Sequence, residues 1–296
     1  MLEFKPLSED DCPRLRTILT NAPDRGCEYT LGNLFIWRKH YATTMASCHE
    51  AALIRFEKDA HAYLFPVGTG CDIKNVIDEL VEENRKNKEK FRIIAARKED
   101  CDLLESLFPD KFKYHLTRDY AEYVYNTEDL AELVGKKFHS KRNFISRFTA
   151  EHPDYEFCEI TRENLAQVCE MNNLWYEENL TSDNDGLAEE RIAASVALES
   201  MFDIGLVGGF IKSNDRILAY SIGEPINENT FCVHIEKAFH EIIGAYAIIN
   251  RDFVRHFCKD YMYVNREDDV GDEGLRRAKL SYNPAIITEK YVVEEK

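Results

Sequence analysis

The sequence lacks any C-x-x-C pair and any long apolar run. Its nine cysteines are scattered over 296 residues, which argues against both a zinc ribbon and a disulfide framework. No segment approaches the roughly 20 apolar residues that a membrane-spanning helix needs, and the N-terminal MLEFKPLSEDD is acidic where a signal or transit peptide would be basic. We therefore expect a soluble, cytoplasmic chain without a metal site.

Basic residues are also scarce relative to acidic ones. The chain has 38 Lys and Arg against 54 Asp and Glu, a net charge of −16, which excludes a generally basic nucleic-acid coat. Apolar residues make up 44%, including 17 Phe and 15 Tyr, too many for a disordered acidic chain. At about 150 residues per domain, the length predicts two folded domains.

The second half of the chain shows a clear order of elements. Hydrophobic periodicity and turn residues predict a strand at 155–160, helices at 161–180 and 187–202, strands at 204–211, 216–224 and 229–237, a helix at 243–258, a strand at 261–265, a helix at 272–281 and a strand at 286–293. The first 120 residues repeat this order less cleanly, ending in a strand predicted at 111–125. The two halves share the order of elements but no sequence identity.

This order is the one used by the GNAT acyltransferase fold, and two such lobes in tandem resemble the Fem-type aminoacyl transferases. Residues 119–125 (DYAEYVY), 135–143 (GKKFHSKRN) and 264–284, from VNREDD to KLSYNP, are similar to the lysylphosphatidylglycerol synthetase C-terminal domain family, in particular its stand-alone members. The resemblance implies an α+β chain of two GNAT-like lobes, each a mixed, mostly antiparallel sheet flanked by helices. We predict an N-terminal lobe at 1–125, a basic linking helix at 126–149 and a C-terminal lobe with the active site at 150–296.

The same resemblance implies transfer of an aminoacyl group from aminoacyl-tRNA to an amine or hydroxyl acceptor. An acyl-CoA-dependent GNAT enzyme instead holds pyrophosphate on a glycine-rich loop at a helix N-terminus. Here the corresponding stretch, 237–246, has Glu241 at the cationic position and Tyr246 at the second small position. A carboxylate there would repel a diphosphate, so acetyl-CoA is disfavoured and no cofactor is expected. An acyl-CoA N-acyltransferase and a non-catalytic protein that binds RNA or a phosphorylated ligand are the alternatives.

A local excess of positive charge occurs at 136–147, which has five basic residues and no acidic one. Lys141 falls within the apolar stripe of the predicted helix, provided that the helix continues past Gly135. A buried ammonium needs a partner, so a phosphate-bearing ligand and a structural ion pair are both open, as is a helix break that exposes Lys141. On the first alternative, Lys137, Lys141 and Arg142 would contact phosphates of a tRNA acceptor end.

Candidate acid–base groups lie on the strand predicted at 229–237. Strict alternation would place Cys232, His234 and Glu236 on one face, so Glu236 or His234 could deprotonate an acceptor amine. On the neighbouring strand, Tyr220 and Glu224 would also share a face. A polar, half-exposed sheet surface is an equally good explanation.

The last motif provides the remaining candidates. Arg276, Lys279 and Tyr282 follow one another at spacings of three, as neighbours on one helix face, and Asn265 and Asp269 precede them as candidate substrate ligands. The resemblance implies that Lys279 holds a phosphate or the developing oxyanion. Complementing the helix dipole would explain the order of charges without function.

An aromatic pair follows an apolar helix in the second half. Trp175, next to Tyr176, could line the acceptor pocket or belong to a packed core.

Overall fold

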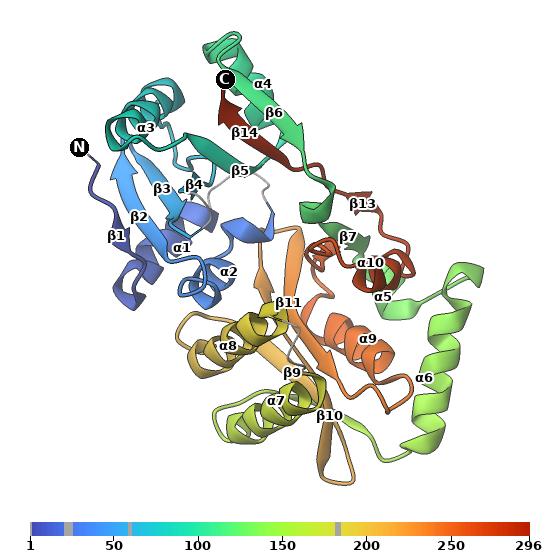
Figure 1. Cartoon of the computed structure of the whole chain (residues 1–296). Helices are drawn as coiled ribbons and strands as arrows, with labels where there is room; N and C mark the ends of the chain where they lie inside the picture. Colours follow the sequence, from blue (N-terminus) through green and yellow to red (C-terminus); the bar gives the residue numbers. More distant parts are fainter. Residues whose placement is uncertain (1, 21–25, 59–60, 181–184) are drawn as a thin grey trace. The chain divides into compact units, whose positions relative to one another are not determined.

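The chain folds into two compact units (Figure 1). The computed structural model describes residues 2–20, 26–58, 61–180 and 185–296. Unit 1 consists of Met1–Glu122, Asp268–Asp272 and Ile287–Lys296, and unit 2 consists of Tyr123–Glu267 and Glu273–Ile286. Two seven-stranded mixed sheets are flanked by helices, which confirms the predicted α+β fold of two GNAT-like lobes.

Unit 1 is built on the sheet β1-β2-β3-β4-β5-β14-β6, in which β4 and β5 are parallel and the other pairs antiparallel. Its strands are β1 (Lys5–Pro6), β2 (Thr43–Cys48), β3 (Ala51–Phe56), β4 (Ala62–Tyr63), β5 (Arg92–Ala96), β6 (Phe112–Leu116) and β14 (Tyr291–Glu295). Its helices are α1 (Cys12–Thr20), α2 (Leu31–Ile36), α3 (Ile73–Asn87) and α4 (Lys98–Leu107), with 3-10 turns η1 (Glu9–Asp11), η2 (Cys27–Tyr29) and η3 (Arg118–Tyr120). The apolar faces of α3 and α4 form one core with the sheet.

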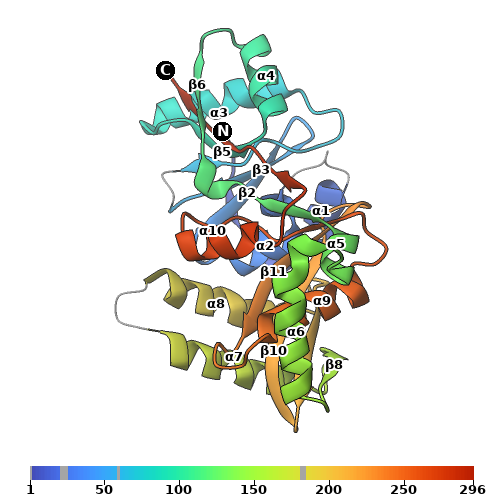
Figure 2. The same ribbon diagram turned by 90° about the vertical axis from the view of Figure 1, so that its right-hand side faces the viewer.

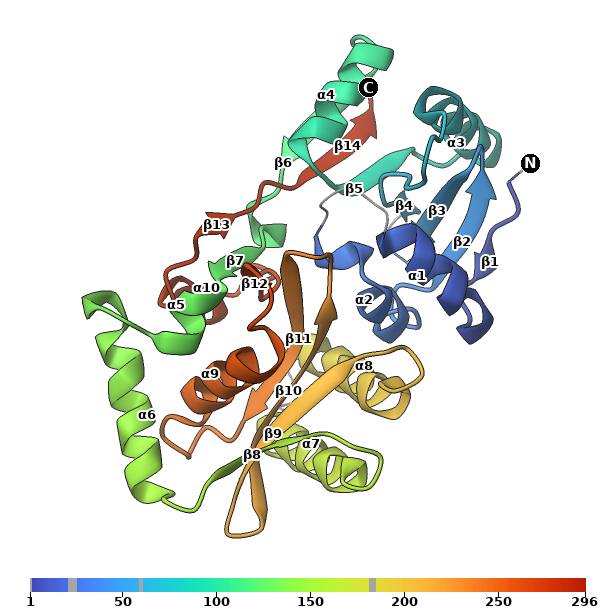
Figure 3. The ribbon, with the colours of Figure 1, turned by 180° about the vertical axis from the view of Figure 1, so that it is seen from behind.

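Unit 2 is built on strands in the order β13-β7-β12-β11-β10-β9-β8. They are β7 (Tyr123–Asn126), β8 (Glu156–Glu159), β9 (Val207–Ser213), β10 (Arg216–Pro225), β11 (Thr230–Ala238), β12 (Tyr263–Asn265) and β13 (Ile286–Ile287). The helices are α5 (Thr127–Glu132), α6 (His139–Glu151), α7 (Leu165–Asn179), α8 (Asp185–Ser200), α9 (Ala245–Phe257) and α10 (Glu273–Leu280), with the 3-10 turn η4 (Lys136–Phe138). Helices α7 and α8 lie on one side of the sheet and α9 on the other (Figures 1 and 3), and α6 packs along α9 (Figure 2).

Two predicted strands are each divided between the units. The stretch 111–125 forms β6 and β7 with a 3-10 turn between them, and 286–293 forms β13 and the start of β14. Strand β7 pairs with β12 in the sheet of unit 2, whereas β14 pairs with β5 and β6 in unit 1. The units therefore differ from the predicted ranges 1–125 and 150–296, because each sheet takes a strand from the other half of the sequence.

A buried charged triad holds the C-terminal segment within unit 1. The Lys290 ammonium lies 2.8 Å from Glu122 Oε1 and also contacts Glu28 Oε1. Burial opposes both charges, but the two carboxylates hold the pKa of Lys290 well above its usual value, and Lys290 holds that of Glu122 below its usual value. Burial, together with the negative charge of Glu122, raises the pKa of Glu28 to about 7. Lys290 is therefore the shared counterion of Glu122 and Glu28.

Candidate active site

The candidate site lies where β11 and β12 diverge in unit 2. The two strands are parallel and pair only from Thr230–Tyr263 to Cys232–Asn265. Strand β11 then continues to Ala238 without β12 beside it. Side chains from this open stretch can meet side chains from the segment after β12.

A β-bulge changes which residues of β11 face the same way. Ile222 pairs with Ile235 and Gly223 with Val233, which leaves His234 without an opposite residue on β10. Beyond this bulge Glu236 faces α9, where its Oε2 accepts a hydrogen bond from Asn250 Nδ2 at 3.2 Å. The prediction that His234 and Glu236 share a face is wrong, because it assumed unbroken alternation.

Glu236 forms a buried ion pair with Arg266, which follows β12. Arg266 Nη2 lies 2.8 Å from Glu236 Oε1, and although burial opposes its charge, this carboxylate holds the pKa of Arg266 above its usual value. Arg266 Nη1 and Asn250 Oδ1 are two of eight buried side-chain polar atoms that have no hydrogen-bond partner among the described residues. These two lie on residues that bond the same carboxylate, Glu236, so a donor and an acceptor are left open at one place, which makes it a candidate ligand site.

Tyr282 lies close to two cations, Lys141 and Arg266. The Lys141 ammonium is 3.8 Å from the centre of the Tyr282 ring and the Arg266 guanidinium is 4.9 Å from it. Lys141 Nζ also donates to Ser281 Oγ at 2.7 Å. Burial and the positive charge of Arg266 lower the pKa of Lys141 to about 8, although Glu236 opposes the shift. We call Lys141, Glu236, Asn250, Arg266 and Tyr282 the β11–β12 cluster.

The basic segment is not the continuous helix that the first two alternatives for Lys141 assumed; it is broken, as the third alternative supposed. Helix α5 ends at Glu132, Leu133 and Gly135 have positive φ angles of 53° and 90°, and α6 begins at His139. The break does not expose Lys141, because α6 directs it towards Tyr282.

The neighbouring cations of this segment contact the protein itself. Lys137 pairs with Asp129 at 2.9 Å, and Arg142 Nη1 donates to the carbonyls of Leu133 and Gly135 at 2.5 and 2.7 Å. Of the three predicted phosphate contacts, the structure brings Lys141 alone into the β11–β12 cluster.

Lys279 supports the segment that carries Arg266. Its Nζ donates to the carbonyl oxygen of Arg266 at 2.6 Å, and its own carbonyl accepts from the Tyr125 hydroxyl at 2.8 Å. Arg276 lies on the same helix, α10, and is partly buried. In this structure Lys279 thus acts on the cluster by positioning Arg266.

Other predicted residues lie outside the cluster. The Trp175 indole donates to the Ala238 carbonyl at 2.8 Å and the Tyr220 hydroxyl to Asn172 at 2.6 Å, both in the core beside α7. Asn265 accepts from the amide of Glu267 at 2.8 Å. Asp269 belongs to unit 1, where it is fully buried and lies 3.4 Å from Arg118.

His234 belongs to a separate buried group. Its Nδ1 lies 2.7 Å from Glu267 and its Nε2 3.1 Å from Glu224. Burial disfavours the imidazolium, but Cys232 and the two carboxylates raise the pKa of His234 well above its usual value. A histidine that holds its proton in this way is a poor general base near neutral pH, which leaves Glu236 as the candidate.

Sequence reasoning missed Arg266 and Asn250 as site residues. Arg266 lies within the VNREDD motif, next to Asn265 and close to Asp269, which were predicted as substrate ligands. Asn250 is a buried polar residue on an otherwise apolar face of α9, and such a residue is itself a signal, because burying an amide requires partners.

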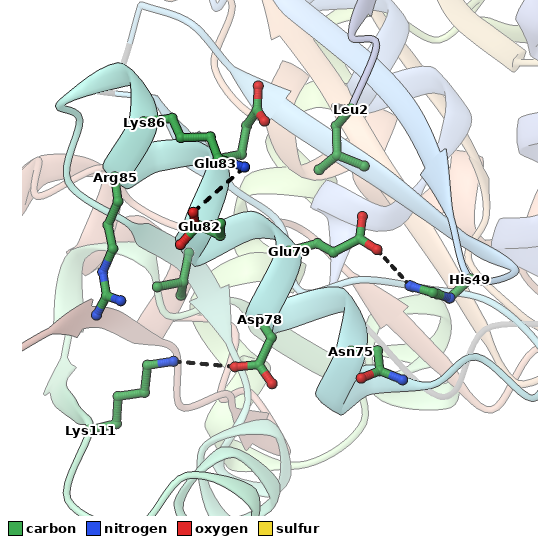
Figure 4. Close-up of a pocket in the computed structure, with 11 residues that line it drawn as sticks. Leu2, His49, Asn75, Asp78, Glu79, Glu82, Glu83, Arg85, Lys86 and Lys111 are labelled. Carbon is green, nitrogen blue, oxygen red and sulfur yellow. Dashed lines mark hydrogen bonds and ion pairs between the residues drawn. The ribbon is translucent and has the colours of Figure 1, made fainter.

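A surface cavity of about 740 Å³ lies elsewhere, in unit 1 (Figure 4). Its charged residues are largely paired with one another: Glu79 with His49, Asp78 with Lys111, and Glu82 with Lys86. This pairing leaves little charge for recognising a ligand, so the cavity does not compete with the β11–β12 cluster. None of the described helices is both long and apolar enough to cross a membrane.

Comparison with known proteins identifies the family of the chain. Residues 20–294 match the family described as phosphatidylglycerol lysyltransferase, C-terminal. The chain belongs to this family. A conserved protein of unknown function from Bacteroides thetaiotaomicron is 38% identical, with a TM-score of 0.94 and full coverage of both chains.

More distant structures share the fold. L-PGS from Bacillus licheniformis is 16% identical, with a TM-score of 0.66 over 95% of this chain and 91% of that one. FemX is 10% identical, with a TM-score of 0.60 over 98% and 96%. These structures share their fold with this chain over 95% and 98% of its length.

Proposed function

We propose that the chain transfers an aminoacyl group from aminoacyl-tRNA to an amine or hydroxyl acceptor at the β11–β12 cluster. The observation that carries the proposal is that Arg266 and Asn250, which both bond Glu236, each keep one buried polar atom without a partner, Nη1 and Oδ1, and that Lys141 lies close to Arg266 and Glu236. An aminoacyl ester needs a cation for the oxygen that becomes negative and an acceptor for the proton that is released.

Four groups of the cluster have a role in this reaction. The acceptor nitrogen or oxygen forms a bond with the ester carbonyl carbon, and the carbonyl oxygen, which becomes negative, is stabilised by Arg266. Glu236 takes the proton of the acceptor. When the carbon–oxygen bond to the ribose breaks, that proton passes to the ribose oxygen. Lys141 binds the adjacent phosphate, Tyr282 holds Lys141 and Arg266 in place, and Lys279 positions Arg266.

The start of α9 supports a donor other than acetyl-CoA. A Cβ atom on Gly244, before the first turn, would lie 2.3 Å from the carbonyl oxygen of Phe144 in α6. Glu241 lies in the preceding loop and pairs with Arg216 at 3.5 Å. The backbone of Phe144 and the carboxylate of Glu241 thus lie where an acyl-CoA enzyme presents free backbone amides to the pyrophosphate.

Acetyl-CoA should therefore show no binding in titration calorimetry up to millimolar ligand concentration. The reason is that neither the backbone packing nor the charge of this loop suits a diphosphate. Micromolar affinity would instead favour the acyl-CoA enzyme.

Aminoacyl-tRNA binding should depend on the charge of Lys141. A suitable probe is 3′-aminoacylamido-3′-deoxyadenosine 5′-phosphate, in which an amide replaces the reactive ester. Lys141→Met should weaken binding about tenfold at pH 7, because a charge-assisted contact to phosphate is lost. In the unmodified chain, affinity should fall as the pH rises from 7 to 9, because the amine with a pKa of about 8 loses its proton.

Lys137→Met is the matched control, because Lys137 lies in the same basic segment but pairs with Asp129. This variant should bind like the unmodified chain and keep the pH dependence. If Lys141→Met also did so, Lys141 would have no role in binding.

The proposed activity is tested with total tRNA charged with one radiolabelled amino acid at a time. The charged tRNA is incubated with the chain and a pool of bacterial small molecules and lipids, and label that leaves the acid-precipitable tRNA is followed into a new product. Enzyme-dependent transfer is expected for at least one amino acid. Binding of charged tRNA without transfer would favour a non-catalytic binding protein.

A further inference from the structure

A second group of side chains in unit 2 has the composition of a metal site. Cys232, His234 and Glu267 each offer one ligand atom, and these atoms lie within 4.8 Å of one another. Cys232 Sγ is 3.5 Å from His234 Nδ1 and 4.0 Å from Glu267 Oε1, and His234 Nδ1 is 2.7 Å from Glu267 Oε1. The proposed aminoacyl transfer does not use these residues, so the two proposals are independent.

Two further groups of possible ligands occur among the described residues, and both fit a metal less well. One consists of the half-buried Cys48 with His49 and Glu79, which are exposed and line the cavity of unit 1 (Figure 4), and burial, together with Glu79, raises the pKa of the Cys48 thiol to about 11. The group of Cys27, Glu28 and Glu122 already surrounds the ammonium of Lys290.

One of the three distances in this group, between Cys232 and His234, already suits tetrahedral coordination, whereas Cys232 Sγ and Glu267 Oε1, at 4.0 Å, must approach by roughly 0.4 Å. With metal–sulfur and metal–nitrogen bonds of about 2.3 and 2.0 Å, tetrahedral ligand atoms lie about 3.3–3.6 Å apart. The distance between Cys232 and His234 is in this range, at 3.5 Å. The contact between His234 and Glu267 must open by roughly 0.6 Å to meet the geometry, and the Glu267 side chain, 23% exposed, has room to move.

The surrounding residues resemble the outer shell of a metal site. Glu224, whose side chain is 4% exposed, lies 3.1 Å from His234 Nε2. A carboxylate there fixes the tautomer that leaves Nδ1 as the ligand atom, as in carboxylate–histidine–zinc arrangements. Glu267 has a φ of 57°, and Asn265 Oδ1 holds this turn by accepting from the Glu267 amide at 2.8 Å.

We propose that Cys232, His234 and Glu267 bind a divalent transition-metal ion of the zinc class, with Glu224 orienting the histidine. The sulfur, nitrogen and oxygen donors match zinc or cobalt, whereas magnesium and calcium prefer oxygen ligands alone. Three protein ligands leave a fourth tetrahedral position for water or a substrate group. Because the ligands are Cys-x-His on one strand plus a distant glutamate, a search for C-x-x-C pairs could not find them.

The test is metal stoichiometry of the full-length chain purified without a polyhistidine tag. After removal of metal, the chain is titrated with Zn²⁺ or Co²⁺ and dialysed, and its metal is measured by mass spectrometry. About one equivalent per chain is expected, and the Co²⁺ form should show a near-ultraviolet thiolate charge-transfer band. Absence of binding at 100 µM metal, about 5 kcal/mol of affinity, would overturn the proposal.

Single substitutions test which residues bind the metal. Cys232→Ala and His234→Gln should each remove the bound equivalent and the thiolate band, and Glu224→Gln should weaken affinity roughly 10- to 100-fold. Cys258→Ala is the matched control, a buried cysteine of unit 2 outside the group, and should keep both signals. If Cys232→Ala or His234→Gln fails to fold, Glu267→Gln tests the site by the same two signals, the bound metal and the thiolate band. Loss of the signals on Cys48→Ala, but not on Cys232→Ala, would contradict the proposal.

Discussion

The Lys290→Met variant should lose about 3–5 kcal/mol of its free energy of unfolding, the cost of removing one partner from a buried ion pair. Lys290 is 4% exposed and is the cation shared by Glu122 and Glu28. Without it, the Glu122 carboxylate stays buried with no ammonium beside it. Since Lys290 directly precedes β14, the variant should also weaken the pairing of β14 with β5 and β6.

Urea unfolding followed by circular dichroism measures this loss. Lys296→Met is the control, because Lys296 forms an exposed ion pair with Asp110 at 3.4 Å, and such pairs contribute about 0–1 kcal/mol. A loss of under 1 kcal/mol for Lys290→Met would show that the triad does not hold the C-terminal segment.

The Arg266→Lys variant should transfer aminoacyl groups about 100-fold more slowly, because it loses the donor that faces the developing oxyanion. Lysine keeps the positive charge beside Glu236 but not the second nitrogen of the guanidinium, so the fold should survive. The effect should appear in kcat with KM nearly unchanged, as for an interaction made in the transition state alone.

Arg255→Lys is the matched control for this prediction. Arg255 is also an arginine of unit 2, but it contacts Glu132 and the carbonyl of Ala131 at the surface. Its replacement should leave turnover unchanged. Equal rates for Arg266→Lys and the unmodified chain would remove Arg266 from the reaction.

The sequence predicted the order of elements well because their signals are local. The periodicity at 243–258 marks α9, and the apolar side chains of this helix pack on β11. The pairing of strands is not local. Nothing in the alternation of 286–293 indicates that its two ends belong to different sheets, so the exchange of β7 and β14 was beyond sequence reasoning.

The candidate site was likewise predicted only where its signals are local in the sequence. Glu236, Tyr282 and Lys141 were found from strand position, helix spacing and local charge, and the structure brings all three together. The bulge at His234 depends on the pairing with β10, so the faces of β11 could not be predicted. The role of Arg266 depends on β12 diverging from β11, another long-range feature.

A crystal structure with 3′-aminoacylamido-3′-deoxyadenosine 5′-phosphate shows directly whether the β11–β12 cluster binds the aminoacyl end of the proposed donor. We expect the carbonyl oxygen of the ligand within hydrogen-bond distance of Arg266 Nη1, and its phosphate beside Lys141. A ligand bound elsewhere, with no contact to Arg266, Asn250 or Lys141, would contradict it.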